Sequence, residues 1–236
     1  MIWKKLDRPP IEGELNTLFF VTNESDSLFL KRVPKENNTL LEQIETEYTK
    51  TMFLPLGGQF RIRSPKEQFL FSTKAARAGL KVLSPVAIEN EAIYYPFLKN
   101  TSTIKRYFSS KKVKVSHILN QLFNDLRRAH ALGIVYGDRW LPNILVKPNH
   151  EVVHIDFDIE IFGKWAKEFE VSQVIYYTTL AGKKLVLPTI IEYFKAEKWF
   201  NSSVVSTFLD ASVKFFKNSK YGGINNLVAD IISGID

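Results

Sequence analysis

The sequence predicts an α+β protein with a β-rich N-terminal part that carries one main helix, followed by a mostly helical C-terminal part. Short apolar, β-prone runs separated by turn residues fill most of residues 1–98, whereas helical spacing of apolar residues dominates from residue 115 onward. The chain has 236 residues, 45% of them hydrophobic, which is enough to bury a sizeable core in one large domain or two lobes. We expect the first lobe to span residues 1–98 and the second to span residues 99–236.

Composition excludes several classes of protein. The chain has no cysteine, so disulfides and thiolate metal sites are excluded. The first residues lack the apolar core of a signal peptide, and no run approaches the roughly 18 apolar residues of a spanning helix. A cytoplasmic protein is therefore expected, with a peripheral position at the inner face of the membrane as the alternative. The net charge of +7 hints at an anionic partner.

The N-terminal elements follow from turn and capping signals. The runs LNTLFFVTN and SLFLKRV flank a polar turn and predict a β-hairpin, and the polar residues 35–50 form either a loop or a short surface helix. Ser64 begins a helix as N-cap, with Glu67 completing a capping box and Gly79 as terminator. A second hairpin follows, with Asn90 in its turn.

The C-terminal elements begin after a basic stretch, KNTSTIKRYFSSKKVK, which covers residues 99–114 and is the best candidate for a linker. Apolar residues at helical spacing then predict a helix from Val115 to Ala129, with Gly133 as its stop. Two short apolar strands follow, ILV and VVHI, and the remaining chain alternates helix-like patterns with short breaks.

Three polar residues are placed around these two strands. Asn143 precedes ILV, Asp156 follows VVHI, and Asp138 lies five residues before Asn143. If the strands pair in antiparallel fashion, Asn143 and Asp156 meet at one edge, where a carboxylate and an amide oxygen suit Mg²⁺. Asp138 would then face a substrate and accept a proton from a hydroxyl group, the division of labour that phosphoryl transfer requires.

The stretch GDRWLPNILV followed by HIDFD resembles the catalytic and metal loops of the protein-kinase-like superfamily. It is most similar to the small atypical kinases and phosphotransferases: lipopolysaccharide sugar kinases, aminoglycoside phosphotransferases and the kinase of the tRNA threonylcarbamoyl machinery. The resemblance implies a two-lobed protein-kinase-like fold, ATP and Mg²⁺ as cofactors, Asp138 as the catalytic residue, and Asn143 and Asp156 as metal ligands.

The resemblance also implies positions for the nucleotide. Lys31 in LFLKRV matches the lysine that binds the α and β phosphates, and Asn16 lies in a segment that resembles the weak phosphate loop of the phosphotransferases. Tyr95 and Phe97 belong to AIYYPFL, which resembles the hinge that binds adenine through its backbone. Glu67 is the candidate acid to pair with Lys31.

Four departures from the pattern leave points open. Gln68, not Glu67, occupies the aligned position of the helix glutamate, so whether Glu67 or another acid pairs with the lysine is open. Asp158 replaces the glycine of protein kinases, and whether it contacts metal is open as well. Tyr136 and Gly137 replace His-Arg before Asp138, and Glu170 replaces an aspartate that braces the catalytic loop.

The predicted function is transfer of the γ-phosphate of Mg-ATP to a hydroxyl acceptor, with a sugar or lipopolysaccharide-type acceptor favoured. One alternative is an atypical protein Ser/Thr kinase or ATPase in an RNA-modifying complex, and another is a pseudokinase that only binds a partner. The basic residues of 99–114 predict an anionic acceptor or docking surface, such as a phosphorylated sugar lipid, a membrane surface or RNA. These residues are Lys99, Lys105, Arg106, Lys111, Lys112 and Lys114.

Overall fold

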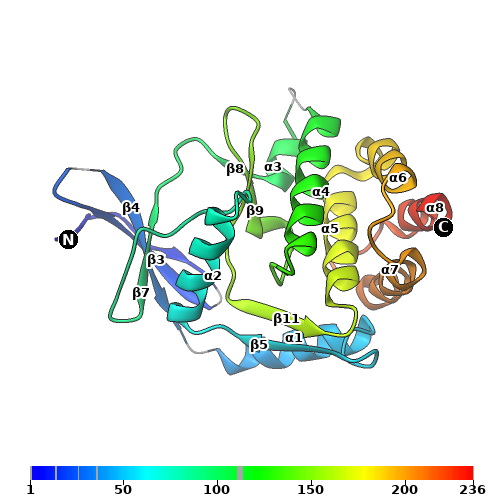
Figure 1. Cartoon of the computed structure of the whole chain (residues 1–236), viewed down its shortest axis with the longest axis horizontal. Coiled ribbons are helices and arrows are strands. Elements are labelled where there is room, and N and C mark those ends of the chain that lie inside the picture. Colours follow the sequence, from blue (N-terminus) through cyan, green and yellow to red (C-terminus); the bar gives the residue numbers. More distant parts are fainter. Residues whose placement is uncertain (1, 14, 26, 36, 111–113, 236) are drawn as a thin grey trace.

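The computed structural model describes residues 2–13, 15–25, 27–35, 37–110 and 114–235. It has the predicted division: a twisted antiparallel sheet with one helix beside it at one end, and a group of helices at the other (Figure 1). Two small sheets lie between these parts and complete the architecture.

The larger sheet has the strand order β1-β3-β4-β7-β6, and β2 also pairs with β3. The elements of this part are β1 (Lys4–Lys5), β2 (Ile11–Glu12), β3 (Asn16–Thr22), β4 (Leu28–Pro34), α2 (Pro65–Arg77), β6 (Ala87–Glu89) and β7 (Ala92–Pro96). Both predicted hairpins are confirmed, because β3 pairs with β4 and β6 pairs with β7 in antiparallel register. Asn90 occupies the second turn with a φ of 46°, a conformation that Asn tolerates better than most residues.

Helix α2 begins where the sequence predicts. The Ser64 side chain accepts from the Glu67 backbone N–H, and the Glu67 side chain accepts from the Ser64 backbone N–H. This reciprocal capping box satisfies two N–H groups that the first turn of a helix leaves unpaired. Its position between the two hairpins along the chain brings α2 against β6 and β7.

Between β4 and α2, the chain makes an excursion to the C-terminal part. Helix α1 (Asn38–Lys50) packs against α7, and β5 (Gly58–Ile62) pairs along five residues with β11 (Ile159–Gly163). Figure 1 shows α1 and the sheet of β5 and β11 at the lower edge of the molecule, running toward the helices. Helix α1 and β5, although they precede residue 98, therefore pack with the second part of the chain.

The C-terminal part contains a large core of apolar side chains from its helices. Its elements are β8 (Ser102–Thr103), α3 (Ile104–Phe108), α4 (Val115–Ala131), η1 (Leu141–Asn143), β9 (Ile144–Val146), β10 (Val152–His154), β11, α5 (Ala166–Gly182), η2 (Lys183–Leu185), α6 (Leu187–Ala196), α7 (Ser202–Phe216) and α8 (Asn225–Ile235). The predicted pairing of the strands around Asn143 and Asp156 is confirmed, since β9 and β10 are antiparallel.

The basic stretch is not simply a linker. Its first half forms β8 and α3, and Ile104, Tyr107 and Phe108 are buried in the core of the C-terminal part. Lys99, Lys105, Arg106 and Lys114 are exposed, whereas Lys111 and Lys112 lie outside the described residues. In the part of the chain that the structure describes, no helix is both long and apolar enough to cross a membrane.

Candidate active site

Two adjoining cavities lie between the sheet and the helical part. The first, of about 430 Å³, is lined by Asp138, Asn143 and Asp156, and by residues of β3 and α1. The second, of about 240 Å³, is mostly apolar and lies between Leu18 and Leu30 from the sheet and Leu145 and Ile155 from the C-terminal part. Asp156 and Ile155 line both cavities, so they form one continuous cleft.

The structure brings the three predicted residues Asp138, Asn143 and Asp156 together. The Asn143 side-chain amide donates to the Asp138 backbone carbonyl at 3.0 Å, so its oxygen is the atom left to bind a cation. Pairing of β9 with β10 places Asn143 and Asp156 at the same end of this ribbon, as the sequence predicts. Asp156 has a φ of 59°, a conformation that is costly for a non-glycine residue and that clusters at functional sites.

Buried polar groups hold this constellation in place. The guanidinium of Arg139, which is fully buried, donates to the backbone carbonyls of Ile155 and Asp156 at 3.1 and 2.5 Å. From α5, Glu170 accepts from the Gly137 backbone N–H at 2.8 Å, and Gln173 donates to the Asp138 carboxylate at 3.4 Å. Glu170 therefore braces the loop that carries Asp138. One helical turn later in α5, Gln173 orients the Asp138 carboxylate.

The structure does not bring Lys31 into the cleft. On β4, Lys31 lies on the outer face of the sheet, where its ammonium group is 5.7 Å from the centroid of the Tyr94 ring. Its neighbour Arg32 points to the opposite face, is 7% exposed and lines the apolar cavity. Successive residues of a strand alternate between faces, so the basic group at the candidate nucleotide site is Arg32.

Arg32 joins several groups of the cleft. It forms ion pairs with Asp156 at 3.1 Å and Asp158 at 2.7 Å, and it donates to the Gln68 side-chain oxygen. With the amide oxygen of Asn16 turned toward it, Arg32 also donates to that oxygen at 2.9 and 3.2 Å. Burial and the charge of Asp156 raise the pKa of Asp158 to about 7, although Arg32 opposes the shift.

Among solved structures, the chain is similar to the Rio2 kinase from Chaetomium thermophilum in complex with ADP, Mg²⁺ and phosphoaspartate. The match covers 98% of this chain and 70% of that chain, with a TM-score of 0.51 and 13% sequence identity. The chain has the two-lobed protein-kinase-like fold. No protein-family model matches the sequence, and no curated protein matches it.

In this kinase-like fold, Glu67 does not contact Lys31. Its carboxylate pairs with Arg61 at 2.7 Å on the surface and closes the capping box with Ser64. The hydrogen bond from Arg61 and those from Ser64 lower the pKa of Glu67 to about 2. The contact between α2 and the basic residue of β4 is made instead by Gln68, which is buried and bonds Arg32. An arginine–glutamine pair thus stands where the resemblance predicts a lysine–glutamate pair.

The segment expected to form the hinge lies at the edge of the apolar cavity. Tyr95 and Phe97 line it, together with Leu98 and Thr101 of the connection between the lobes. Burial raises the pKa of Tyr95 to about 12, so its hydroxyl stays neutral at physiological pH. The Phe97 backbone N–H donates to the Leu28 carbonyl at 3.1 Å, which fixes the end of β7 against β4. The cavity therefore offers an apolar slot whose position fits a nucleotide base.

The donor set beside this slot fits Mg²⁺. Among the described residues, no three His, Asp or Glu side chains are arranged to hold a metal by themselves. Mg²⁺ usually takes only one or two carboxylates from the protein and completes its shell with water and substrate phosphates. Asp156 with the Asn143 amide oxygen meets that requirement, and Asp158 lines the same cavity.

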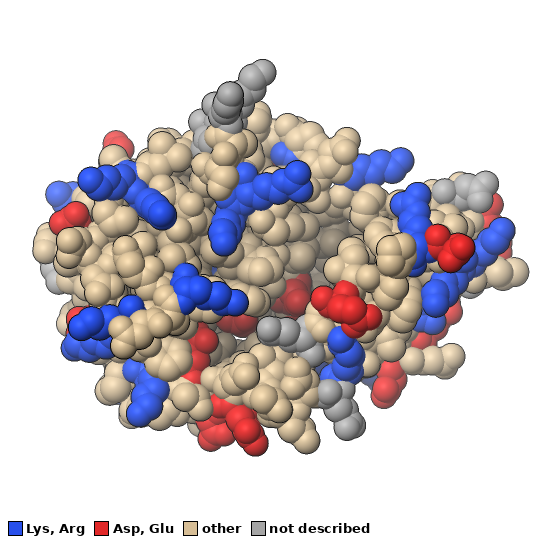
Figure 2. All heavy atoms as spheres, turned by 180° about the vertical axis from the view of Figure 1, so that it is seen from behind, with Lys and Arg blue, Asp and Glu red and all other residues tan. Residues whose placement is uncertain are grey.

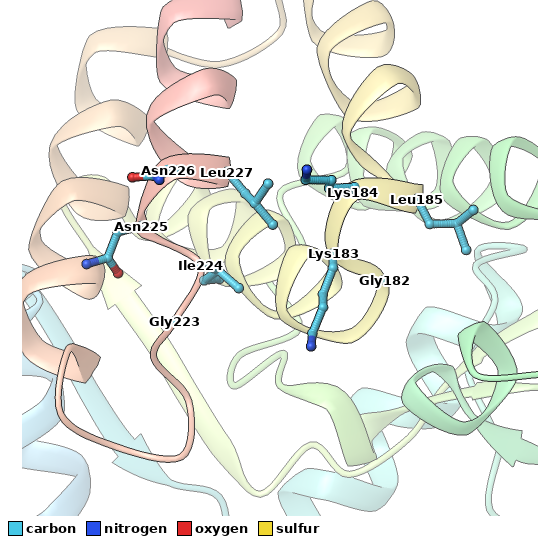
Figure 3. Close-up of a pocket in the computed structure, with 9 residues that line it drawn as sticks. All are labelled: Gly182, Lys183, Lys184, Leu185, Gly223, Ile224, Asn225, Asn226 and Leu227. Carbon is cyan, nitrogen blue, oxygen red and sulfur yellow. The ribbon is translucent and has the colours of Figure 1, made fainter.

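A separate hollow lies far along the chain from these residues, between the end of α5 and the start of α8 (Figure 3). Lys183, Lys184 and Asn225 are among its lining residues, and no carboxylate or aromatic side chain of the described chain lines it. It therefore offers neither a base slot nor metal ligands. The cleft between the lobes is the stronger candidate for the active site.

Proposed function

We propose that the protein is an ATP-dependent phosphotransferase that moves the γ-phosphate of Mg-ATP to a hydroxyl acceptor. The observation that carries this proposal is the convergence of Asp138, Asn143, Asp156 and Arg32 on one cleft that continues into an apolar slot. Phosphoryl transfer needs positioning and charge more than covalent chemistry, and these four side chains supply both.

The residues of the chain divide the work as follows. Asp138, oriented by Gln173, accepts the proton of the acceptor hydroxyl. Arg32 binds phosphate oxygens through its planar fork of N–H donors, the role first expected of Lys31. Asn143 and Asp156 would hold Mg²⁺, which would supply positive charge beside the phosphates when bound. The nucleotide side of the cleft is supplied by residues 1–98, except for α1 and β5. The catalytic and metal loops are supplied by residues 99–236.

The cavity that contains Asp138 favours a small hydroxylated acceptor over a protein segment. Helix α1 closes one side of this cavity with Leu40, Ile44 and Tyr48, and the aromatic residues Trp140 and Tyr221 also line it. Aromatic faces beside carboxylates suit a sugar ring or another compact polyol. A protein hydroxyl, as in the atypical kinase alternative, would have to reach Asp138 past α1.

The basic residues of 99–114 bear on docking and not on the group that accepts the phosphate. None of the described basic residues of 99–114 lines either cavity of the cleft. Their exposed charges form part of the outer surface, where they attract anions through a field screened over about 8 Å at physiological salt. An anionic lipid or RNA surface is thus a candidate for docking at this face, not for the group that accepts the phosphate.

One observation favours a second function, nucleotide-dependent binding without transfer. Arg32 forms ion pairs with both Asp156 and Asp158, so the carboxylate of the candidate metal ligand Asp156 is already paired with a cation of the protein itself. If Mg²⁺ does not compete with these ion pairs, the protein binds nucleotide but transfers no phosphate. In that case, the protein is a pseudokinase.

The test is transfer of labelled γ-phosphate from Mg-ATP to a fractionated lysate, with protein, lipid and small-molecule fractions scored separately. We expect the label in the small-molecule fraction with the wild type and none above background with Asp138→Asn or Asp156→Ala. Asp138→Asn should keep nucleotide affinity, because it acts on the acceptor, whereas Asp156→Ala should lose it. Nucleotide binding by the wild type without label in any fraction would favour the pseudokinase.

A further inference from the structure

Lys31, which the resemblance assigns to the nucleotide, lies instead in a hollow on the outer face of the larger sheet. This hollow has a volume of about 470 Å³, and its lining includes Trp3, Lys5, Phe19, Lys31, Glu89 and Tyr94. Helix α2 bonds Arg32 on the opposite face of the sheet, and the cleft between the lobes lies on that face too. The hollow is therefore separate from the candidate active site.

Strand pairing fixes which side chains meet in this hollow. Phe19 of β3 lies directly opposite Lys31 of β4, and Lys31 lies directly opposite Tyr94 of β7. Lys5 of β1 pairs with Val21, which is two residues after Phe19 and therefore on the same face. Directly opposed residues of neighbouring strands share a face of the sheet, so these side chains form one row across β1, β3, β4 and β7.

Cations and aromatic rings alternate in this row. The Lys5 ammonium group is 4.6 Å from the centroid of the Phe19 ring, and the Lys31 ammonium group is 5.7 Å from the centroid of the Tyr94 ring. Trp3, from the segment before β1, stacks on Tyr94 with the two ring centroids 4.2 Å apart. Each lysine of the hollow thus has an aromatic ring directly beside it.

Both ammonium groups are available to an anion. The carboxylate that lines the hollow in the described chain is Glu89, and it accepts the Trp3 indole N–H at 3.0 Å. Lys5 is exposed and Lys31 is half-buried, and a cation on a ring that water reaches is held only weakly. Either lysine can therefore turn to a phosphate oxygen without losing a strong contact.

The charges around the hollow show why particular lysines matter. In Figure 2, basic and acidic side chains lie side by side at the end of the molecule that carries the larger sheet, on the right. The described side chains drawn there form no uniformly basic surface. An anionic partner at this end must therefore be held by individual lysines, such as those of the hollow, and not by a broad positive field.

We propose that the outer face of the larger sheet binds single-stranded nucleic acid, with Lys5 and Lys31 on its phosphates and the rings of Trp3 and Phe19 against its bases. Phosphates and flat bases alternate along a single strand, and a row of alternating cations and rings matches both. A double helix keeps its bases stacked inside and would meet only the lysines. A membrane surface is met by side chains that project, whereas these rings lie in a hollow. The inference is independent of the proposed phosphotransferase function.

The experiment measures the fluorescence anisotropy of a labelled oligouridine of about twelve nucleotides, within the usual size of a single-strand site. The competitors are the same strand in a duplex, inorganic polyphosphate, and vesicles of phosphatidylcholine and phosphatidylserine. The double variant Lys5→Gln, Lys31→Gln is compared with a matched control, Lys105→Gln, Arg106→Gln, which removes two exposed positive charges outside the hollow. A third variant, Trp3→Leu, removes a ring but no charge.

We expect the Lys5→Gln, Lys31→Gln variant to bind the strand more weakly than the wild type. The slope of log K against log salt should fall in magnitude by about 1.4, because two phosphate contacts at about 0.7 each are lost. Trp3→Leu should weaken binding at least about fivefold and leave this slope unchanged, because stacking on a base is not electrostatic. The control variant should bind like the wild type.

Several results would overturn the assignment. Equal losses in the two double variants would indicate general attraction of charge, and unchanged affinity in Trp3→Leu would show that no base stacks there. Polyphosphate, the duplex or the vesicles competing as well as the single strand would likewise contradict it, as would a wild type that does not bind the strand. If Trp3→Leu lost its cooperative melting transition, Phe19→Leu would replace it with the same expected loss of affinity.

Discussion

Replacing Arg32 by alanine is the sharpest test of which basic residue of β4 serves the nucleotide. Arg32 is 7% exposed and bonds Asp156, Asp158 and Gln68. Burial by itself would lower the pKa of Arg32, but the charges of Asp156 and Asp158 raise it above its ordinary value. Its removal leaves two neighbouring carboxylates without a counter-charge and the candidate phosphate site without its cation.

The magnitude follows from the burial of these ion pairs. Loss of one partner of a buried ion pair costs about 3–5 kcal/mol. In a domain of this size, each kcal/mol lowers the Tm by about 2–4 °C, so Arg32→Ala should melt roughly 6–20 °C below the wild type. Lys31 supplies the control, because its contact with the Tyr94 ring at 5.7 Å contributes about 0.5–1 kcal/mol.

The assay is thermal melting at pH 7.5 with and without Mg-ATP, together with titration of the nucleotide. Arg32→Ala should lose the stabilisation by Mg-ATP, whereas Lys31→Ala should keep nearly all of it. Arg32→Lys should be intermediate, since a lysine keeps the charge but not the planar fork that reaches several acceptors at once.

Either of two results would refute this reasoning. If Lys31→Ala loses nucleotide affinity as severely as Arg32→Ala, the face of β4 that serves the nucleotide has been assigned incorrectly. Unchanged melting of Arg32→Ala would likewise show that Arg32 does not neutralise Asp156 and Asp158.

Three further predictions follow from individual contacts. Glu67→Ala should lower the unfolding midpoint in denaturant slightly, because it removes the capping box. A loss of nucleotide affinity as large as that of Arg32→Ala would instead place Glu67 in the nucleotide site. Glu47→Gln should have a higher Tm than the wild type at pH 9, and this difference in Tm should disappear toward pH 4.5. Burial raises the pKa of Glu47 from 4.5 to about 8, so ionisation of Glu47 costs stability as the pH rises. A difference in Tm that stays constant with pH would contradict this. Gly137→Ala should prevent stable folding, because a Cβ at this φ of 107° would lie 1.9 Å from the Ile159 carbonyl oxygen, and a wild-type melting curve would contradict the chain path.

Local signals in the sequence were enough to predict much of the fold and the mutual placement of the candidate site residues. The capping box of Ser64 and Glu67 and the two N-terminal hairpins depend on residues close in sequence, and all are present in the structure. The same holds for Asn143 and Asp156, because the short hairpin of β9 and β10 brings them together without help from distant residues. Asp138 lies beside this hairpin, because the Asn143 side-chain amide donates a hydrogen bond to the Asp138 backbone carbonyl.

The basic residue at the candidate nucleotide site was decided only by the tertiary structure. In β4, Leu28, Leu30 and Arg32 face one side and Phe29, Lys31 and Val33 the other, so the two faces are almost equally apolar and each carries one cation. The pattern of a strand with two apolar faces does not say which face turns to the cleft, and a choice that is wrong by one residue reverses every side chain. Likewise, the capping box explained Glu67 locally, and only the packing of α2 showed that Gln68 contacts Arg32.

The position of α1 beside the cavity of Asp138 could likewise not be predicted from the sequence, because it depends on contacts between distant segments. The sequence of residues 35–50 indicates at most a polar surface helix, and nothing in it names a partner. Its contact with α7 and the pairing of β5 with β11 join segments about a hundred or more residues apart. Such contacts depend on the complementary shapes of surfaces that exist only after both lobes have folded. Sequence alone therefore brought Asp138, Asn143 and Asp156 together as candidates, and tertiary packing decided which other side chains, Arg32 and Glu47, line the same cleft.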